Sequence, residues 1–191
     1  MVVSQACPMC SCPVILGGGI TILLSVGLIP ENELSKSAGV PLDRRTSGPE
    51  VFDNMETDVE GVFACGNVVH VHDLVDFVTA ESQKAGRSAA KYIQNGEYGR
   101  NDCISVKNGS AVNYTVPQKI RPAGVEKQVE IFFRVNNVYK NMAIRVTSGE
   151  QQIARFKREH MAPGEMERIL IPKMLLDKVT GQELTVSVIP E

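Results

Sequence analysis

The stretch Thr57-Asp58-Val59-Glu60-Gly61-Val62-Phe63-Ala64-Cys65-Gly66-Asn67 decides how the fold of this sequence is interpreted. Its apolar run at 61–65 is short and stops at a glycine followed by an amide. Such a run predicts a buried strand, and a glycine at its end lets a ligand approach the main chain closely. Asn67 can then hydrogen-bond that ligand. The alternative is that Asn67 only turns the chain after the strand.

Residues before this stretch predict a second buried strand. The run ITILLSV at 20–26 is continuously apolar and is followed by Gly27, which is typical of a strand buried on both faces of a parallel sheet. Pro30 and the acidic residues after it predict a short helix, with Gly39 as its C-cap. Residues 1–19 have no helical or strand period, and we expect an irregular leader there.

Residues after the stretch predict first a helix and then many strands. From about Leu74 to Ile93 the spacing is helical, and the expected inner face consists of Leu74, Val78, Ser82, Ala85, Ala89 and Tyr92. We expect Gly86 in this helix to pack closely against a neighbour. Residues 99–111 are expected to form a linker. Short runs separated by turn signals then predict strands at 112–116, 129–135, 139–146, 153–157, 168–171 and 184–189.

The fold class predicted from these patterns is α/β, with buried strands typical of a parallel sheet and a long helix at 20–98, and an antiparallel β-sandwich-like domain at 112–191. The formal net charge of -2 and the lack of a Lys/Arg run argue against nucleic acid as a partner. No apolar stretch is long enough to predict a membrane span. The odd number of cysteines, five, does not suggest a secreted disulfide scaffold, so we expect a cytoplasmic protein.

Two segments resemble signatures of one enzyme family. The stretch that ends at Gly66-Asn67 resembles the second flavin-contact motif of flavoproteins with two dinucleotide-binding domains, although Asn67 stands where the family usually has Asp. Residues 23–32 (LLSVGLIPEN) resemble the family's apolar strand followed by G-x-x-P-N, with Glu31 inserted. The chain is thus similar to the C-terminal part of the FAD-dependent pyridine nucleotide-disulfide oxidoreductases, and this resemblance implies that residues 20–98 form part of a Rossmann-like FAD-binding domain. The run 66–76 is similar to a bacterial NAD(P)/FAD-dependent subgroup related to sarcosine oxidase alpha subunits or to partners of anaerobic glycerol-3-phosphate dehydrogenase.

The resemblance implies where a flavin would lie. Gly66 and Asn67 would contact the sugar-alcohol arm of FAD, and the start of the long helix would face the ring. The helix residues implicated are Asp76, Phe77, Val78 and Thr79. For Phe77 and Val78 the alternative is an ordinary place in the core. No individual catalytic residue can be assigned.

The resemblance also implies an activity, which would be hydride transfer from NAD(P)H to FAD and then to an unidentified acceptor. The sequence contains neither of the two G-x-G-x-x-G units on which the family holds its cofactors. We therefore expect the isolated chain to be an inactive portion of a flavoenzyme with little or no tight FAD binding. The alternative is a non-catalytic subunit whose β-rich domain docks a partner dehydrogenase. Open sheet faces would also favour self-association.

Metal binding is not expected from the sequence. Cys7, Cys10 and Cys12 form C-x-x-C-x-C, which can bind zinc or an iron–sulfur cluster, but incidental cysteines in a leader explain them as well. His70, His72 and Asp73 lack further ligands nearby in sequence, and metal sites need three or four. We expect these histidines to lie in a loop near the flavin or in solvent. The basic side chains around 155–160 are expected on a solvated sheet face or on a surface for a partner subunit.

Overall fold

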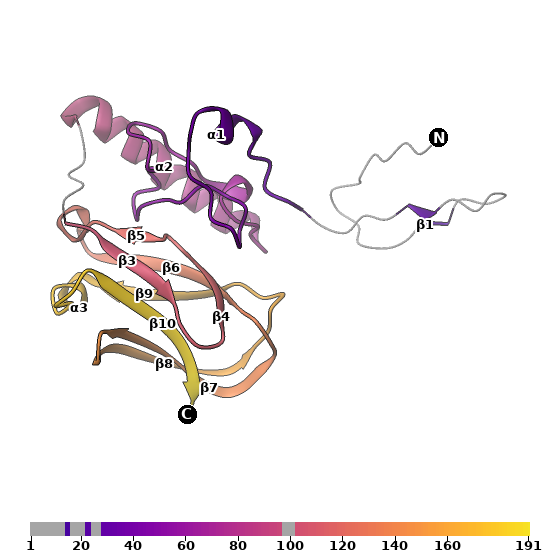
Figure 1. The fold of residues 1–191 in the computed structure, drawn as a ribbon, viewed down its shortest axis with the longest axis vertical. Coiled ribbons are helices and arrows are strands. Elements are labelled where there is room, and N and C mark those ends of the chain that lie inside the picture. The colour runs from indigo at the N-terminus through magenta and orange to yellow at the C-terminus, as the bar shows by residue number, and fades with distance from the viewer. Residues whose placement is uncertain (1–13, 16–21, 24–27, 97–101) are drawn as a thin grey trace.

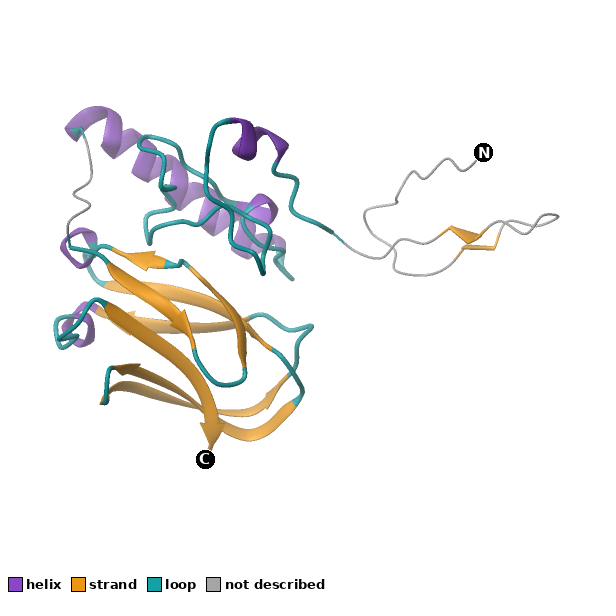
Figure 2. Cartoon of the chain, viewed as in Figure 1, coloured by secondary structure: helices purple, strands orange, loops and turns teal. Residues whose placement is uncertain are grey.

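The computed structural model describes residues 14–15, 22–23, 28–96 and 102–191, and it places a helical layer against a β-rich layer (Figure 1). The helical layer consists of residues 28–96. It contains α1 (Glu33–Ser37), the 3₁₀ helix η1 (Gly66–Val68) and the long helix α2 (Val75–Asn95). Loops make up most of the rest of this layer, whereas strands dominate from residue 104 onward (Figure 2).

The β-rich layer contains two sheets. The larger sheet has the strand order β5-β3-β10-β7-β8 and the smaller one β4-β6-β9. The short helices η2 (Pro122–Gly124) and α3 (Lys173–Leu176) lie between strands. The strands are β3 (Ile104–Asn108), β4 (Val112–Val116), β5 (Lys119–Ile120), β6 (Gln128–Val135), β7 (Tyr139–Ser148), β8 (Gln151–Met161), β9 (Glu167–Pro172) and β10 (Glu183–Pro190). All six strands expected after residue 111 are therefore confirmed, because turn residues bound each of them.

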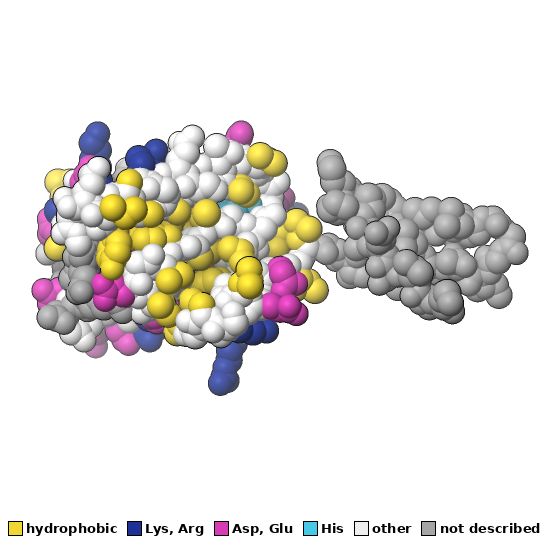
Figure 3. Space-filling view, turned by 90° about the horizontal axis from the view of Figure 1, so that it is seen from above, with side chains coloured by type: hydrophobic (Ala, Val, Ile, Leu, Met, Phe, Trp, Pro, Cys, Tyr) yellow, Lys and Arg dark blue, Asp and Glu magenta, His cyan; other side chains and the backbone are white. Residues whose placement is uncertain are grey.

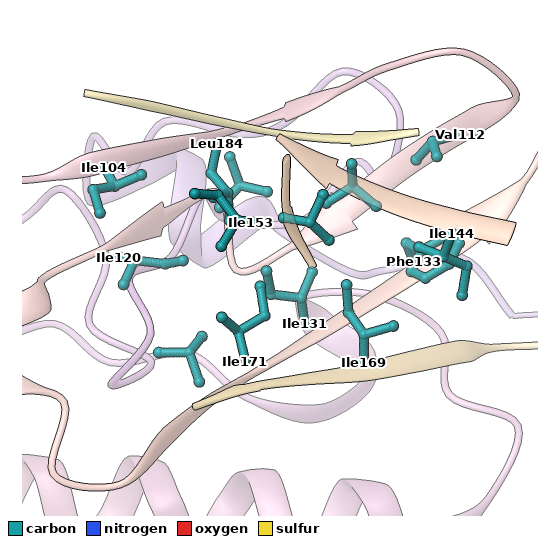
Figure 4. Close-up of a cluster of buried hydrophobic side chains, with 14 of the residues drawn as sticks. Ile104, Val112, Ile120, Ile131, Phe133, Ile144, Ile153, Ile169, Ile171 and Leu184 are labelled. Atoms are coloured by element: carbon teal, nitrogen blue, oxygen red, sulfur yellow. The ribbon is translucent and has the colours of Figure 1, made fainter. Parts of the chain in front are cut away.

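One apolar core joins the two sheets. Ile131, Phe133 and Ile169 from the smaller sheet meet Ile144 and Leu184 from the larger one, and all five are 2 % exposed or less (Figure 4). Alternate residues of each strand point into this core, as the period of two requires. The expectation of purely antiparallel pairing was wrong for one pair of strands, since β10 runs parallel to β3 and antiparallel to β7. β3 itself lies within the stretch 99–111 that suggested a linker.

The parallel sheet expected in the N-terminal part is not formed by the described residues. Within the run at 20–26, the two-residue strand β2 (Ile22–Leu23) pairs antiparallel with β1 (Val14–Ile15). The run at 61–65 makes a single bridge, from Phe63 to Glu56. A short apolar run becomes a strand of a parallel sheet only where parallel strands satisfy its backbone groups, and among the described residues both pairings of these runs are antiparallel.

The two layers share a buried interface. Arg121 donates from Nη1 to Glu56 Oε2 over 2.8 Å, and these side chains are 6 % and 1 % exposed. The Arg121 backbone N–H donates to Asp53 Oδ1 over 2.8 Å, and its guanidinium carbon lies 3.5 Å from the centre of the Phe52 ring. A second apolar cluster fills the interface and contains Val51, Met55, Val69, Ala85, Tyr114 and Val116. The expected boundary between two domains is therefore crossed by core packing and by a buried ion pair.

None of the helices in the described parts of the chain is both long enough and apolar enough to cross a lipid bilayer.

Candidate functional site

The turn at Gly66 and Asn67 is tight and buried at its first residue. Cys65 is extended, and Gly66 then takes a φ of 71°, a backbone conformation that residues other than glycine rarely adopt. A Cβ at Gly66 would also lie 3.2 Å from Cγ1 of Val78 in α2. The Gly66 carbonyl accepts hydrogen bonds from the N–H groups of Val69 (2.9 Å) and His70 (3.3 Å), which closes the turn. The glycine is thus needed both for the turn and for the close approach of α2.

The residues proposed for flavin contact divide into two groups. Asn67, Asp76 and Thr79 are exposed, whereas Phe77 and Val78 are half-buried. Phe77 packs edge-on against Phe132 of the β-rich layer, with ring centres 5.5 Å apart, and the Arg168 guanidinium lies 5.5 Å from its ring centre. The side chain of Phe77 therefore contributes to the interface between the layers. Asn67 and the exposed start of α2 remain together on an accessible surface.

Asn32 ties the two signature segments together. Its side chain is buried, and Nδ2 donates to the carbonyls of Val68 (2.8 Å) and Ser47 (2.9 Å). Its Oδ1 accepts a hydrogen bond from the Ser35 hydroxyl over 2.8 Å. The amide of the segment that resembles G-x-x-P-N thus holds the main chain directly after the Gly66-Asn67 turn, 36 residues further along.

A buried cluster of two histidines and a glutamate lies under the same turn. His70 Nε2 is 3.2 Å from Glu81 Oε1, and His72 Nε2 is 3.2 Å from Glu81 Oε2. The imidazole centres are 4.2 Å apart, and the side chains are at most 4 % exposed. Glu81 Oε2 also accepts the Gly66 N–H over 2.5 Å, and Asn67 Oδ1 accepts the His72 N–H over 3.2 Å. Of the two alternatives expected for these histidines, the solvated one was wrong, because α2 and the β-rich layer cover both rings, whereas a place near the flavin stays a prediction.

Charge in this cluster is set by burial and by mutual contact. Burial lowers the pKa of His70 below its ordinary 6.5, despite the opposing effect of Glu81. Burial alone would raise the pKa of Glu81, but hydrogen bonds and charge interactions with His70 and His72 outweigh it and lower that pKa to about 2. We infer that Glu81 is ionised at neutral pH and that His70 is neutral and donates from Nε2.

Aromatic rings and one ion pair enclose the cluster. The Phe132 ring centre lies 5.8 Å from that of His70 and 5.5 Å from that of His72. Asp73 points elsewhere, since it pairs with Arg134 and its Oδ2 accepts the Met166 N–H over 2.6 Å. Asp73 therefore does not join the two histidines as the combination considered from the sequence would need, and the carboxylate that contacts both rings is that of Glu81.

Sequence reasoning missed Glu81, although a signal for it existed. Glu81 lies three residues after Val78 and four before Ala85, so it belongs to the helix stripe that was expected to be apolar. The buried residues of α2 are Glu81, Ala85 and Ser88, while Ser82 is exposed, so the inner face is rotated slightly from the expected one. A carboxylate on a buried helix face requires partners, and these are the two histidines.

Two other expectations from the sequence concern the N-terminal cysteines and Gly86. Cys7, Cys10 and Cys12 lie outside the described residues. Gly86 is exposed, and a Cβ there would meet no described atom within 4 Å, so close packing does not explain this glycine.

A cavity of about 530 Å³ opens beside the cluster. It lies between the segment that resembles G-x-x-P-N, the loop at 45–47 and the β-rich layer. Its lining includes Pro30, Arg45, Thr46, His70, Tyr114 and Arg134. Arg134 is already engaged, because its Nε donates to the Tyr114 hydroxyl over 3.0 Å and Nη2 donates to the Val71 carbonyl over 3.1 Å.

Comparison with known proteins supports the family resemblance. Residues 18–85 match the family model described as pyridine nucleotide-disulphide oxidoreductase. The match includes Asn32, the Gly66-Asn67 turn and the cluster of His70, His72 and Glu81. It supports an oxidoreductase family whose members typically bind FAD and use NAD(P)H. No solved structure matches this chain.

Proposed function

We propose that this chain supplies the flavin-facing edge of an FAD site in an NAD(P)H-dependent oxidoreductase. Bound FAD would supply the redox chemistry, accepting hydride from NAD(P)H and passing electrons to a further acceptor. The role of the chain itself would be to position the flavin and to favour negative charge on its reduced ring. In this role the chain corresponds to the C-terminal portion of such an enzyme.

The observation that carries this proposal is the link through Asn32. Two segments that resemble flavoprotein signatures are far apart in sequence, yet the Asn32 amide joins them over 2.8 Å at Val68. The link leaves the Gly66-Asn67 turn fixed, with Asn67 exposed.

The residues at this turn fit the sugar-alcohol arm of a flavin. Asn67 Oδ1 is used by the His72 N–H, but Nδ2 donates no hydrogen bond to the described residues and is free to meet a hydroxyl. The Gly66 N–H is already bound to Glu81, so this glycine contributes close approach and not a donor. The N-terminus of α2 has no side-chain cap, so its dipole favours negative charge nearby, while the Asp76 carboxylate in the first turn opposes it.

Weak binding by the chain alone also follows from this assignment. The described residues include no glycine-rich turn for the FAD pyrophosphate, which is the part of the cofactor that helix N-termini and backbone N–H groups hold best. We therefore expect the purified chain to carry no stoichiometric flavin. A full flavin absorption spectrum from the freshly purified chain would contradict this expectation.

The test uses riboflavin, which has the ring and the sugar-alcohol arm but no phosphate. In two-dimensional ¹H–¹⁵N NMR we expect riboflavin to shift amide signals of residues 66–79. Asn67→Ala should weaken its binding about three- to tenfold, the equivalent of one hydrogen bond. Asn95→Ala, at the exposed C-terminal end of α2, is the matched control and should leave binding unchanged. Shifts located elsewhere, or none in a solution saturated with riboflavin, would refute the proposal.

The alternative function is a non-catalytic subunit that docks a partner dehydrogenase. The sequence pointed to the β-rich domain as the docking surface, whereas the support from the structure comes from apolar side chains gathered on the face of the helical layer seen from above (Figure 3). At the start of α2, Leu74 is 55 % exposed and Val75 is 78 % exposed. The basic side chains of β8 give it less support, because Arg158 pairs with Glu167 and Lys157 with Glu191. Sedimentation that shows self-association, abolished by Val75→Lys, combined with no riboflavin shifts would favour this alternative.

A further inference from the structure

We propose that His70, His72 and Glu81 bind a divalent transition-metal ion such as Zn²⁺. This site lies under the proposed flavin edge and shares the turn at Gly66-Asn67 with it, but it does not depend on flavin binding and its test needs no flavin. It rests on the geometry of three side chains that the sequence places apart and the fold brings together.

The spacing of the three side chains fits a metal ion. One ligand atom from each lies within 4.8 Å of the others, and both Nε2 atoms are 3.2 Å from a Glu81 oxygen. Ligands about 2.0–2.1 Å from a tetrahedral ion are separated by about 3.3–3.4 Å. Two imidazoles and one carboxylate are also ligands that Zn²⁺ and Fe²⁺ accept, with further positions left open. The three ligands can therefore close around an ion with small side-chain movements.

The Gly66-Asn67 turn holds all three ligands in place. The Gly66 carbonyl accepts the His70 N–H, the Asn67 side chain accepts the His72 N–H, and the Gly66 N–H binds the Glu81 carboxylate. Each ligand is thus positioned before an ion arrives, which reduces the entropy lost on binding. The Gly66 N–H also orients the Glu81 carboxylate, as hydrogen bonds from groups outside the coordination shell orient metal ligands in known sites.

The surroundings of the cluster limit its affinity. Both Nδ1 atoms are buried and have no hydrogen-bond partner among the described residues. When Nε2 binds a metal, the ring proton moves to Nδ1, where metal-binding histidines normally donate it to a carbonyl or carboxylate. Because loss of such a partner typically costs 10–100-fold in metal affinity, we expect binding weaker than that of a closed structural zinc site.

A fourth ligand has space on the side of His70. The residue His70 borders the cavity of about 530 Å³ together with Thr46 and Tyr114, and its side chain is 0 % exposed. After a small movement of this side chain, a water molecule or a small ligand from the cavity can complete a four-coordinate site. The apolar rings of Phe77 and Phe132 cover the histidines on another side and keep bulk water away.

The experiment uses the full chain with Cys7, Cys10 and Cys12 changed to Ser, because those thiols could bind zinc by themselves. After removal of metals by chelation, we expect one Co²⁺ per chain, with visible absorption bands of a four-coordinate ion and no thiolate charge-transfer band. Zn²⁺ should displace Co²⁺ and raise the melting temperature. His72→Gln and Glu81→Gln should each weaken Zn²⁺ binding at least tenfold in calorimetric titration.

His160→Gln is the matched control. His160 also lies beside a glutamate, with Nδ1 3.6 Å from Glu165, but it is exposed and has no second histidine, so its loss should leave Zn²⁺ binding unchanged. If a cluster variant does not fold, the ¹⁵N signals of the imidazoles in the parent chain give the answer, since Zn²⁺ must shift those of His70 and His72. No metal binding by the folded chain, or binding that survives both cluster variants, would overturn the proposal.

Discussion

At the scale of single residues, this protein stabilises buried polar groups by giving each a specific partner. Asn32 satisfies two backbone carbonyls, and Glu81 accepts from two histidines and one backbone N–H. Burying such groups without partners would cost several kcal/mol each. Asp53 is the weakest case, because its charge is buried and its partners compensate for this only in part.

The Asp53 carboxyl gives a prediction about pH. Burial raises its pKa above the ordinary 3.8, although the Arg121 N–H and the charges of Lys84 and Arg121 oppose the effect. A raised pKa in the folded state means that stability is greatest below the unfolded pKa and declines as pH rises through the folded pKa. Asp53→Asn should therefore increase the free energy of unfolding at pH 7, since Oδ1 can still accept the Arg121 N–H.

Urea denaturation from pH 3 to pH 8 measures this effect. The gain from Asp53→Asn should be present at pH 7 and vanish below about pH 3.8, where the native carboxyl is also neutral. Asp76→Asn, on the exposed start of α2, is a control that removes an equal charge. Destabilisation by Asp53→Asn at pH 7 would show that the charged carboxylate, and not its burial, dominates.

At the scale of elements, three loops meet where α2 begins, and a glycine permits their contact. Gly48 packs so closely on the next loop that a Cβ there would lie 1.8 Å from the Val69 carbonyl oxygen. Asn32 binds on either side of this contact, at Ser47 and Val68. Backbone atoms cannot move away as the tip of a flexible side chain can, so this junction tolerates little change.

Gly48→Ala should accordingly destabilise the protein by at least about 2 kcal/mol, because the two loops must separate. Gly86→Ala is a matched control within α2, where a Cβ meets nothing within 4 Å of the described atoms. It should stabilise the protein by about 0.5–1 kcal/mol through helix propensity. Both values come from urea denaturation followed by circular dichroism. Equal effects of the two substitutions would contradict the close contact at Gly48.

At the scale of the whole molecule, the helical and β-rich layers are expected to unfold together. The buried pair of Glu56 and Arg121 and the apolar cluster around Val51 and Val116 join them. The helical layer has few strand pairs of its own, so most of its burial comes from this interface. Such coupling predicts one cooperative transition in place of two.

Arg121→Ala should weaken this coupling. Removal of one partner from a buried ion pair costs about 3–5 kcal/mol, because the Glu56 charge is left buried. We expect the helical signal to be lost at lower urea than the β signal in this variant, whereas the two transitions coincide in the parent chain. Lys91→Ala removes an exposed ion pair with Glu126 and should change neither transition. Two separate transitions in the parent chain would refute the coupling.

Sequence alone determined the elements that local chemistry specifies. The strands after residue 111 and helix α2 were found because their periods of two and 3.6 and their turn residues are local properties. The resemblance in residues 20–93 was likewise readable, and the family match at 18–85 supports it. The roles of Gly66 in a turn and of Asn67 on an accessible surface also follow from their place in the chain.

Only the tertiary structure decided which distant residues meet. Packing between distant segments brings Glu81 to the two histidines, Asn32 to two loops and β3 alongside β10 in parallel. The hydrophobic period within each segment does not predict which other segment it will contact. The apolar runs at 20–26 and 61–65 also show that sequence alone does not decide which segments pair, since both were expected in a parallel sheet that the described residues do not form. A strand needs neighbours to satisfy its hydrogen bonds, so hydrophobicity by itself could not make either run part of a parallel sheet.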